Sequence, residues 1–151
     1  MKNKTLMTDF YELTMAQTYF NEGKKDEQVY FDLFFRKNPF NGGYTISAGL
    51  DETINYIQNF HFEKKEIDYL KSLGKFNEEF LNYLSTLTFK GDIYAVPDGT
   101  VVFPNEPVLT VKADAVTAQI METALLANFN HGALVTTAAK RIVKEAKDKP
   151  V

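Results

Sequence analysis

The chain has 151 residues, of which 44% are hydrophobic and 25% are charged, a composition typical of one globular domain with its own core. A net charge of −3 argues against nucleic acid or an anionic membrane as the main partner. The absence of cysteine excludes disulfides, thiolate metal sites and cysteine nucleophiles. No apolar run approaches the roughly 20 residues of a membrane helix. Residues 1–4 lead into a helix and not into a signal peptide, so we expect a cytoplasmic protein.

The first predicted helix covers Thr8 to Asn21 and is apolar on two sides. Thr8 or Asp9 can cap it, and Asp9 with Glu12 resembles a capping box. Two apolar stripes lie on roughly opposite sides, one with Phe10, Leu13 and Phe20 and the other with Tyr11, Met15 and Tyr19. Such a helix is buried, or it presents one face to a partner or ligand.

Residues 28–36 are predicted to form a buried, aromatic-rich strand that ends at Arg36. Arg36 and Arg141 are the only arginines in the chain. A planar guanidinium suits phosphate or carboxylate groups. The position is also compatible with a strand-end side chain whose head reaches water, which the residues alone favour without excluding the other interpretation.

The middle of the chain predicts short elements joined by turns. The first of these are a turn at 38–43 and a short strand at 45–47. They are followed by a helix from Leu50, with Ile54 and Ile57 on its inner face, and by helices at about 63–73 and 77–86. Residues 91–112 predict short strands broken at Pro97–Gly99 and Pro104–Pro107, and therefore a small β-rich unit.

From Ala115 the helical period returns. Two helices are predicted, and the sets that pack them are Val116, Ile120, Ala124 and Leu125 in the first and Val135, Ala139, Ile142 and Ala146 in the second. The run Lys149–Val151 resembles the start of a further strand, so we expect the chain to be a piece of a longer protein.

Individual residues indicate no complete active site. His61 lies between aromatic residues and favours a half-buried structural role. His131 lies in the predicted break between the last two helices, where polar site residues are common, but a catalytic role is not favoured. Two histidines without cysteine make a weak metal signal, and neither a phosphate-binding glycine loop nor a Ser-His-Asp set is present. We therefore assign no catalytic residue and no metal ligand.

Four co-linear motifs resemble the nicotinate phosphoribosyltransferase family. They are TDFYELTM at 8–15, FDLFFRKNPF at 31–40, GDIYAVPDGTVVFPNEP at 91–107 and ETALL at 122–126. The resemblance implies an enzyme that joins nicotinate to phosphoribosyl pyrophosphate, with Mg²⁺ and ATP hydrolysis, in NAD salvage. It also implies a homodimer in which each active site takes residues from the neighbouring subunit's N-terminal lobe.

The resemblance carries three substrate-binding candidates. Tyr11 matches the family tyrosine that stacks on the pyridine ring across the dimer interface, and stacking suits a flat aromatic acid. Asp9 matches the aspartate beside it, which either touches substrate or caps the helix. Arg36 matches an arginine near the phosphoribosyl or phosphate groups. Between 127 and 138, Ala127, Gly132 and Ala138 replace the family's usual Asn, Gln and Lys, so that segment receives no site role.

These observations predict an α+β fold. We expect a helix-and-strand lobe at about 1–88, a β-rich, barrel-sandwich-like segment at about 89–113, and connecting helices at about 115–148 that lead toward an absent phosphoribosyltransferase barrel. The chain alone is expected to be inactive and to bind no Mg²⁺ or ATP. The alternative hypothesis is a non-catalytic dimerisation or interaction module derived from that enzyme.

Overall fold

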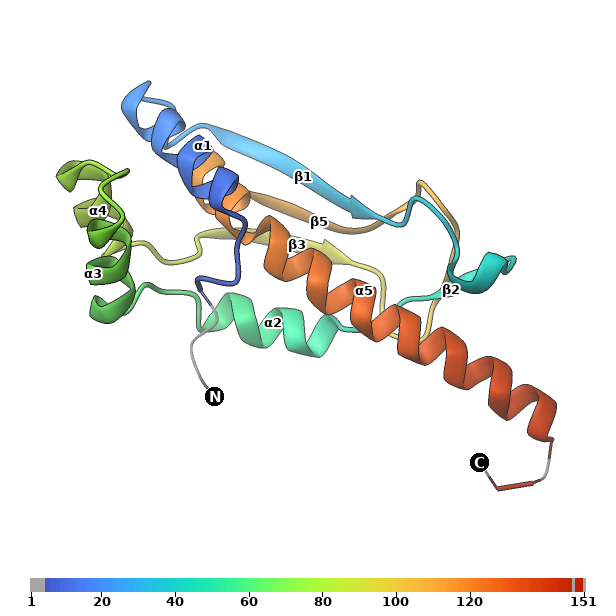
Figure 1. The fold of residues 1–151 in the computed structure, drawn as a ribbon. Coiled ribbons are helices and arrows are strands. Elements are labelled where there is room, and N and C mark those ends of the chain that lie inside the picture. Colours follow the sequence, from blue (N-terminus) through green and yellow to red (C-terminus); the bar gives the residue numbers. More distant parts are fainter. Residues whose placement is uncertain (1–4, 148, 151) are drawn as a thin grey trace.

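The computed structural model describes residues 5–147 and 149–150 (Figure 1). The elements in chain order are α1 (Phe10–Asn21), β1 (Gln28–Phe34), the 3₁₀ turn η1 (Pro39–Asn41), β2 (Thr45–Ile46), α2 (Leu50–Gln58), α3 (Lys64–Ser72), α4 (Glu78–Leu84), β3 (Gly91–Ala95), β4 (Val101–Val102), β5 (Pro107–Asp114) and α5 (Ala115–Ala146). The predicted mixture of helices and strands is confirmed. Among the described residues the strands do not close into a barrel.

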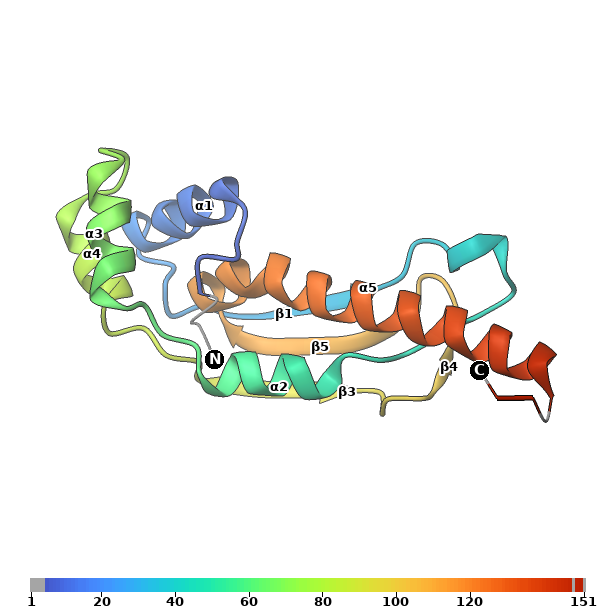
Figure 2. The same ribbon diagram turned by 60° about the horizontal axis from the view of Figure 1, so that its bottom comes forward.

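Three strands form an antiparallel sheet in the order β1-β5-β3. In its register Phe31 lies opposite Val111, which lies opposite Ile93. This face of the sheet is covered by α5, as Figures 1 and 2 show. The opposite face is open to solvent, where Tyr30 is 63% exposed and Tyr94 is 57% exposed. The side chains of β1 therefore alternate between a covered and a solvent-exposed face of the sheet.

The strand at 28–36 was expected to be buried, and this expectation is wrong. In β1 only Leu33 is fully buried, and the alternate side chains are exposed. The strand lies at the edge of the sheet and has one solvent-facing side, so an aromatic-rich run here does not mean burial on both faces. The sheet also combines β1 with β3 and β5, so the β-rich segment at 89–113 shares its sheet with the first lobe. The proposed division of residues 1–151 stays a prediction.

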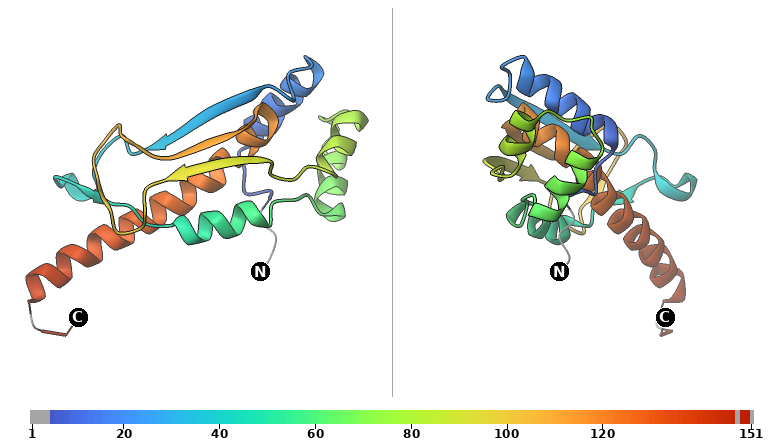
Figure 3. Two further views of the ribbon diagram at one scale, coloured as in Figure 1. Left: turned by 180° about the vertical axis from the view of Figure 1, so that it is seen from behind. Right: turned by 60° about the vertical axis from the view of Figure 1, so that its left-hand side comes forward.

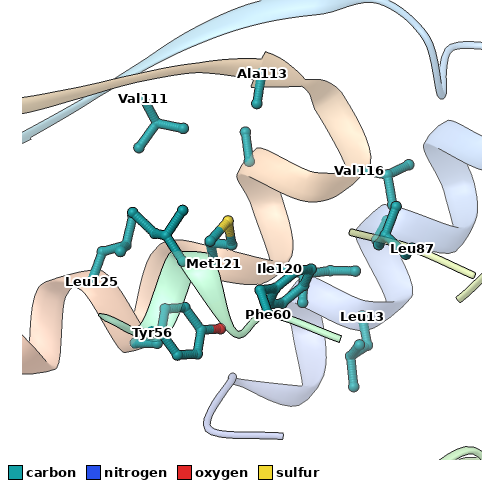
Figure 4. Packing of buried hydrophobic residues seen from close by; sticks show 14 of the residues in the cluster. Leu13, Tyr56, Phe60, Leu87, Val111, Ala113, Val116, Ile120, Met121 and Leu125 are labelled. Carbon is teal, nitrogen blue, oxygen red and sulfur yellow. The ribbon is translucent and has the colours of Figure 1, made fainter. Parts of the chain in front are cut away.

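The main core lies between this sheet, the first half of α5, α1 and α2 (Figure 4). Val116, Ile120, Ala124 and Leu125 are all buried, as predicted for the helix that begins at Ala115. Asp114 caps α5 by accepting a hydrogen bond from the backbone N–H of Thr117 at 2.9 Å, which fixes where the sheet ends and the helix begins.

The short helices α3 and α4 form at one end of the molecule, close to their predicted ranges (Figure 1). Their inner faces carry the expected apolar residues, with Leu70, Phe80, Leu81 and Leu84 buried. On α2, however, Ile57 is buried while Ile54 is 40% exposed, so the predicted inner face of that helix is only partly correct.

The last two predicted helices are one continuous helix, α5, of 32 residues. The predicted break between them, near His131, is absent, and Gly132 lies within the helix. A Cβ atom at position 132 would lie 2.6 Å from the backbone oxygen of Ala48. Gly49 meets the same contact from the other side, with φ at +112° and a Cβ position 2.6 Å from the backbone oxygen of Asn128. Local sequence alone indicates that a helix ends at Gly132, but the close approach of the two backbones explains why glycine stands there.

The second half of α5 extends beyond the sheet, which both views of Figure 3 show. Here Val135, Ala139 and Ile142 are exposed, so the predicted packing face is wrong. The buried side is formed instead by Ala133 and Thr137, whose hydroxyl accepts the backbone N–H of Ile46 at 2.9 Å.

No helix of the described part of the chain has the length and apolar character needed to cross a membrane. The predicted continuation into a new strand at 149–151 includes Val151, which, like residues 1–4 and 148, lies outside the described residues.

Candidate functional site

The first turn of α1 contains two of the three predicted site residues. Asp9 is the N-cap of α1, and the predicted capping box with Glu12 is confirmed. The Asp9 backbone N–H donates to Glu12 Oε2 at 3.3 Å, and the Glu12 N–H donates to the Asp9 carbonyl at 3.1 Å. Asp9 is exposed. Capping therefore accounts for its position, while its carboxylate remains accessible from solvent.

Glu12 is fully buried, although the sequence indicated only a capping role. Its carboxylate accepts hydrogen bonds from the hydroxyls of Thr8 and Thr123, the latter at 2.8 Å. Burial raises the pKa of Glu12, and the two hydroxyls oppose that rise because they stabilise the charged form. A carboxylate in this position joins the start of α1 to the first third of α5.

Tyr11 lies next to this buried carboxylate, with its side chain 49% exposed. Its hydroxyl is 3.5 Å from Glu122 Oε1, to which it donates a long hydrogen bond. Desolvation and the charge of Glu122 raise the pKa of the phenol, which keeps it protonated and able to donate. The ring is held at one end by α5 and is accessible for stacking by an aromatic ligand.

Tyr11 and Met15, which is 38% exposed, form the open side of α1, whereas Tyr19 of the same predicted stripe is partly buried and packs against the core. The first stripe packs inward through Leu13, and Phe20 lies against Phe80 with ring centroids 5.7 Å apart. Phe10 is half exposed and contacts the edge of Phe76 at 5.8 Å. The two predicted stripes are therefore only partly correct, because Phe10 of the first is as exposed as Tyr11 and Tyr19 of the second packs against the core.

Arg36 follows β1 and is exposed. It lines a hollow of about 380 Å³ between β1, β5 and α5. Glu122 lines the same hollow, so one carboxylate both contacts Tyr11 and faces the surface that holds Arg36. Within the described residues Arg36 has no ion pair and no hydrogen bond to Asp9 or Tyr11. Asp9 and Tyr11 lie together at the start of α1, whereas Arg36 shares with them only a hollow that Glu122, the contact of Tyr11, also lines.

The histidines lie elsewhere. His61 is exposed, with Nδ1 2.7 Å from the carbonyl oxygen of Asn59, and is not half-buried as expected. His131 lies on an exposed side of the continuous helix α5, so it is not in a break between helices. Nowhere in residues 5–147 and 149–150 do three or more His, Asp or Glu side chains converge as metal ligands.

Sequence reasoning missed the part played by Glu12, Glu122 and Thr123. Glu122 and Thr123 appeared only as part of a motif, and Glu12 only as half of a cap. One signal was available: Glu12 lies beside Leu13 and one helical turn before Ala16, so it falls on the buried side of α1. A carboxylate on a buried helix face requires hydrogen-bond donors from another element.

Comparisons with known proteins agree with this architecture. The family model described as the nicotinate phosphoribosyltransferase N-terminal domain matches residues 6–130. The nicotinate phosphoribosyltransferase of Mycobacterium tuberculosis is 40% identical over 146 residues, which are 97% of this chain and 31% of that protein. The nicotinate phosphoribosyltransferase of Bacillus subtilis is 42% identical over 138 residues, which are 91% of this chain and 28% of that protein.

The crystal structure of human nicotinic acid phosphoribosyltransferase matches with a TM-score of 0.87 and 30% sequence identity, over 95% of this chain and 29% of that one. The described residues therefore have the fold of the N-terminal region of a phosphoribosyltransferase. The chain belongs to the nicotinate phosphoribosyltransferase family. It spans less than a third of the length of these curated relatives.

Proposed function

We propose that this chain is the N-terminal part of an enzyme that converts nicotinate and phosphoribosyl pyrophosphate to nicotinate mononucleotide and pyrophosphate, with ATP hydrolysis, in NAD salvage. The observation that carries the proposal is the half-exposed ring of Tyr11 on the open side of α1, in a chain of this family. Its location in the cytoplasm is part of the same proposal.

Each site residue has a role that its chemistry supports. Tyr11 stacks on the pyridine ring of nicotinate, because an exposed phenol ring held at its hydroxyl end presents a flat face. Arg36 binds a phosphate group of the sugar substrate, because its guanidinium is permanently charged and is not engaged in an ion pair with a described residue. Asp9 caps α1, and its exposed carboxylate, whose charge acts on the Tyr11 phenol, contributes to binding the same ligand.

The active site proposed for the whole enzyme needs a second subunit. Tyr11 faces outward from its own subunit, which supports a homodimer in which it reaches the neighbour's active site. Mg²⁺ and ATP belong to the proposal for the whole enzyme, where Mg²⁺ supplies charge neutralisation for the departing pyrophosphate. We propose that the chain alone binds neither and has no activity.

A chimeric enzyme tests this proposal. In it, the chain replaces the 28% of the B. subtilis relative to which it aligns, and the protein is made in a host that lacks its own enzyme. We expect the chimera, and not the chain alone, to convert labelled nicotinate to nicotinate mononucleotide. Tyr11→Ala should reduce kcat/KM at least about tenfold, the effect of losing roughly 1.4 kcal/mol of transition-state stabilisation.

Tyr69→Ala is the matched control, because Tyr69 is another exposed helix tyrosine, at 56%, with no assigned role. It should leave kcat/KM within about twofold of the parent. Turnover by the purified chain alone, or equal effects of the two substitutions, would contradict the proposal.

A dimerisation or interaction module is the second candidate function. It is favoured by the apolar side chains of the second half of α5, where Leu134, Val135, Ile142 and Val143 are 46–57% exposed. Light scattering after gel filtration distinguishes the two candidates. An inactive but folded chimera, together with a chain that dimerises through this face, would favour the module. A strictly monomeric chain that binds no barrel-bearing partner would exclude it.

A further inference from the structure

One buried carboxylate connects the first turn of α1 to α5 across 111 positions of sequence. Glu12 accepts hydrogen bonds from Thr8 on its own segment, from the backbone of Asp9, and from Thr123 on α5. The Asp9 N–H is also 3.3 Å from the hydroxyl oxygen of Thr123. We call this set the α1–α5 junction, and its members are Thr8, Asp9, Glu12 and Thr123.

Helix capping alone does not explain this arrangement. For its part in the capping box, Glu12 needs only one carboxylate oxygen at the Asp9 N–H, which an exposed carboxylate provides without desolvation. Glu12 is instead 0% exposed. Burying a carboxylate is costly unless donors surround it, and the donor that comes from outside α1 and its leading segment is Thr123. The junction therefore fixes the position of α1 relative to α5 in addition to starting the helix.

Tyr11 lies directly beside the junction. Tyr11 precedes Glu12 in sequence, and its hydroxyl contacts Glu122, the neighbour of Thr123. Glu122 is held in turn by Gln119, which is 3% exposed and donates from Nε2 to Glu122 Oε2 at 3.1 Å. Two adjacent residues of α5 thus hold the backbone beside Tyr11 and the far end of its ring.

We propose that Glu12 and Thr123 are positioning residues that hold Tyr11 and Asp9 in the geometry that binds the pyridine substrate. The inference deepens the proposed function and rests on it. Neither residue touches substrate, because Glu12 is enclosed and Thr123 is engaged with Glu12. Each acts by restricting the first turn of α1, so loosening the junction lowers the fraction of molecules that present Tyr11 correctly.

Two threonines on α5 provide a matched test. The Thr123 hydroxyl donates to Glu12, whereas the Thr117 hydroxyl is buried and has no hydrogen-bond partner among the described residues. Thr→Val keeps the shape and removes the hydroxyl in both cases. In the active chimera, Thr123→Val should raise KM for nicotinate about tenfold while KM for phosphoribosyl pyrophosphate stays within about twofold. Thr117→Val should change neither, and Thr123→Ser should restore the parent value.

A merely structural role for the junction predicts a different result. It would reduce the folded, active fraction, so the apparent kcat would fall and KM for nicotinate would not change. Equal kinetics for Thr123→Val and the parent, or a loss confined to kcat, would overturn the inference.

Hydrogen exchange on the 151-residue chain separates failure of this inference from failure of the proposed function. Thr123→Val should accelerate exchange of the hydrogen-bonded amides of Asp9 and Glu12 about tenfold, and Thr117→Val should not. Unchanged exchange in Thr123→Val overturns the inference whether or not the chimera is active. If the chimera is inactive while exchange responds as expected, the proposed function fails and the junction is supported.

Discussion

Replacing Gly132 by alanine tests the close contact between α5 and the segment before α2. Intrinsic helix propensity favours alanine over glycine by about 1 kcal/mol, so local reasoning predicts a more stable protein. The structure predicts the opposite, because the new Cβ atom would lie 2.6 Å from the Ala48 oxygen and 3.0 Å from the Gly49 nitrogen. Ordinary contacts begin at 3.4 Å, so the two backbones must separate by several tenths of an ångström.

Overpacking of this kind costs about 1–3 kcal/mol. The upper end applies at position 132, because both opposing atoms are backbone and cannot rotate away. Subtracting the propensity gain leaves a net loss of about 2 kcal/mol, or a fall of about 1 M in the urea midpoint for a slope near 2 kcal/mol per M.

Gly43→Ala is the control for this measurement, because nothing lies within 4 Å of its Cβ position and its φ is not positive. The urea midpoint of Gly43→Ala should stay close to that of the parent. A Gly132→Ala protein as stable as the parent, or more stable, would refute the packing argument.

Three further predictions use the same chain. Tyr56→Phe removes a buried hydroxyl that has no hydrogen-bond partner among the described residues. It should leave the free energy of unfolding unchanged or raise it by about 1 kcal/mol in urea titration; a loss would reveal a partner. Burial raises the pKa of Tyr83 from 10.0 to about 12. The folded state therefore holds the phenol proton of Tyr83 more tightly than the unfolded state does. The free energy of unfolding should fall as the pH rises from 10 to about 12, and it should fall less steeply in Tyr83→Phe. Tyr11→Ala should lower the free energy of unfolding by less than about 1 kcal/mol. Phe129 is fully buried, and Phe129→Ala should lower it by about 3–5 kcal/mol. Similar losses for the two substitutions would show that Tyr11 is a core residue.

The elements that could be predicted from sequence are those determined by neighbouring residues. The capping box of Asp9 and Glu12 is local, so the start of α1 was found within two residues. The turns at Pro97–Gly99 and Pro104–Pro107 separate the strands as expected. The apolar period from Val116 to Leu125 likewise predicted the buried half of α5 correctly.

What could not be predicted depends on contacts between distant residues. Gly132 lies inside α5 against the backbone of Ala48, and nothing near Gly132 in sequence reveals that neighbour. The exposure of alternate side chains in β1 follows from its place at the sheet edge, which pairing with β5 determines.

The candidate site divides in the same way. Tyr11, Asp9 and Arg36 were proposed from motifs, and their roles in substrate binding stay predictions. The burial of Glu12 depends on Thr123, a residue of an element that forms more than 100 positions later. A hydroxyl that pairs with a carboxylate has no sequence pattern of its own, so only the three-dimensional arrangement identifies it.

The unbroken course of α5 has a mechanical consequence. At 1.5 Å per residue, its 32 residues make a rod about 48 Å long. Its first half is fixed in the core next to Tyr11, and its second half projects past the sheet. A tilt of about 5° at the core would swing the far end, about 24 Å away, by about 2 Å. The helix is therefore a lever arm through which a small displacement beside Tyr11 becomes a larger one at its apolar tip.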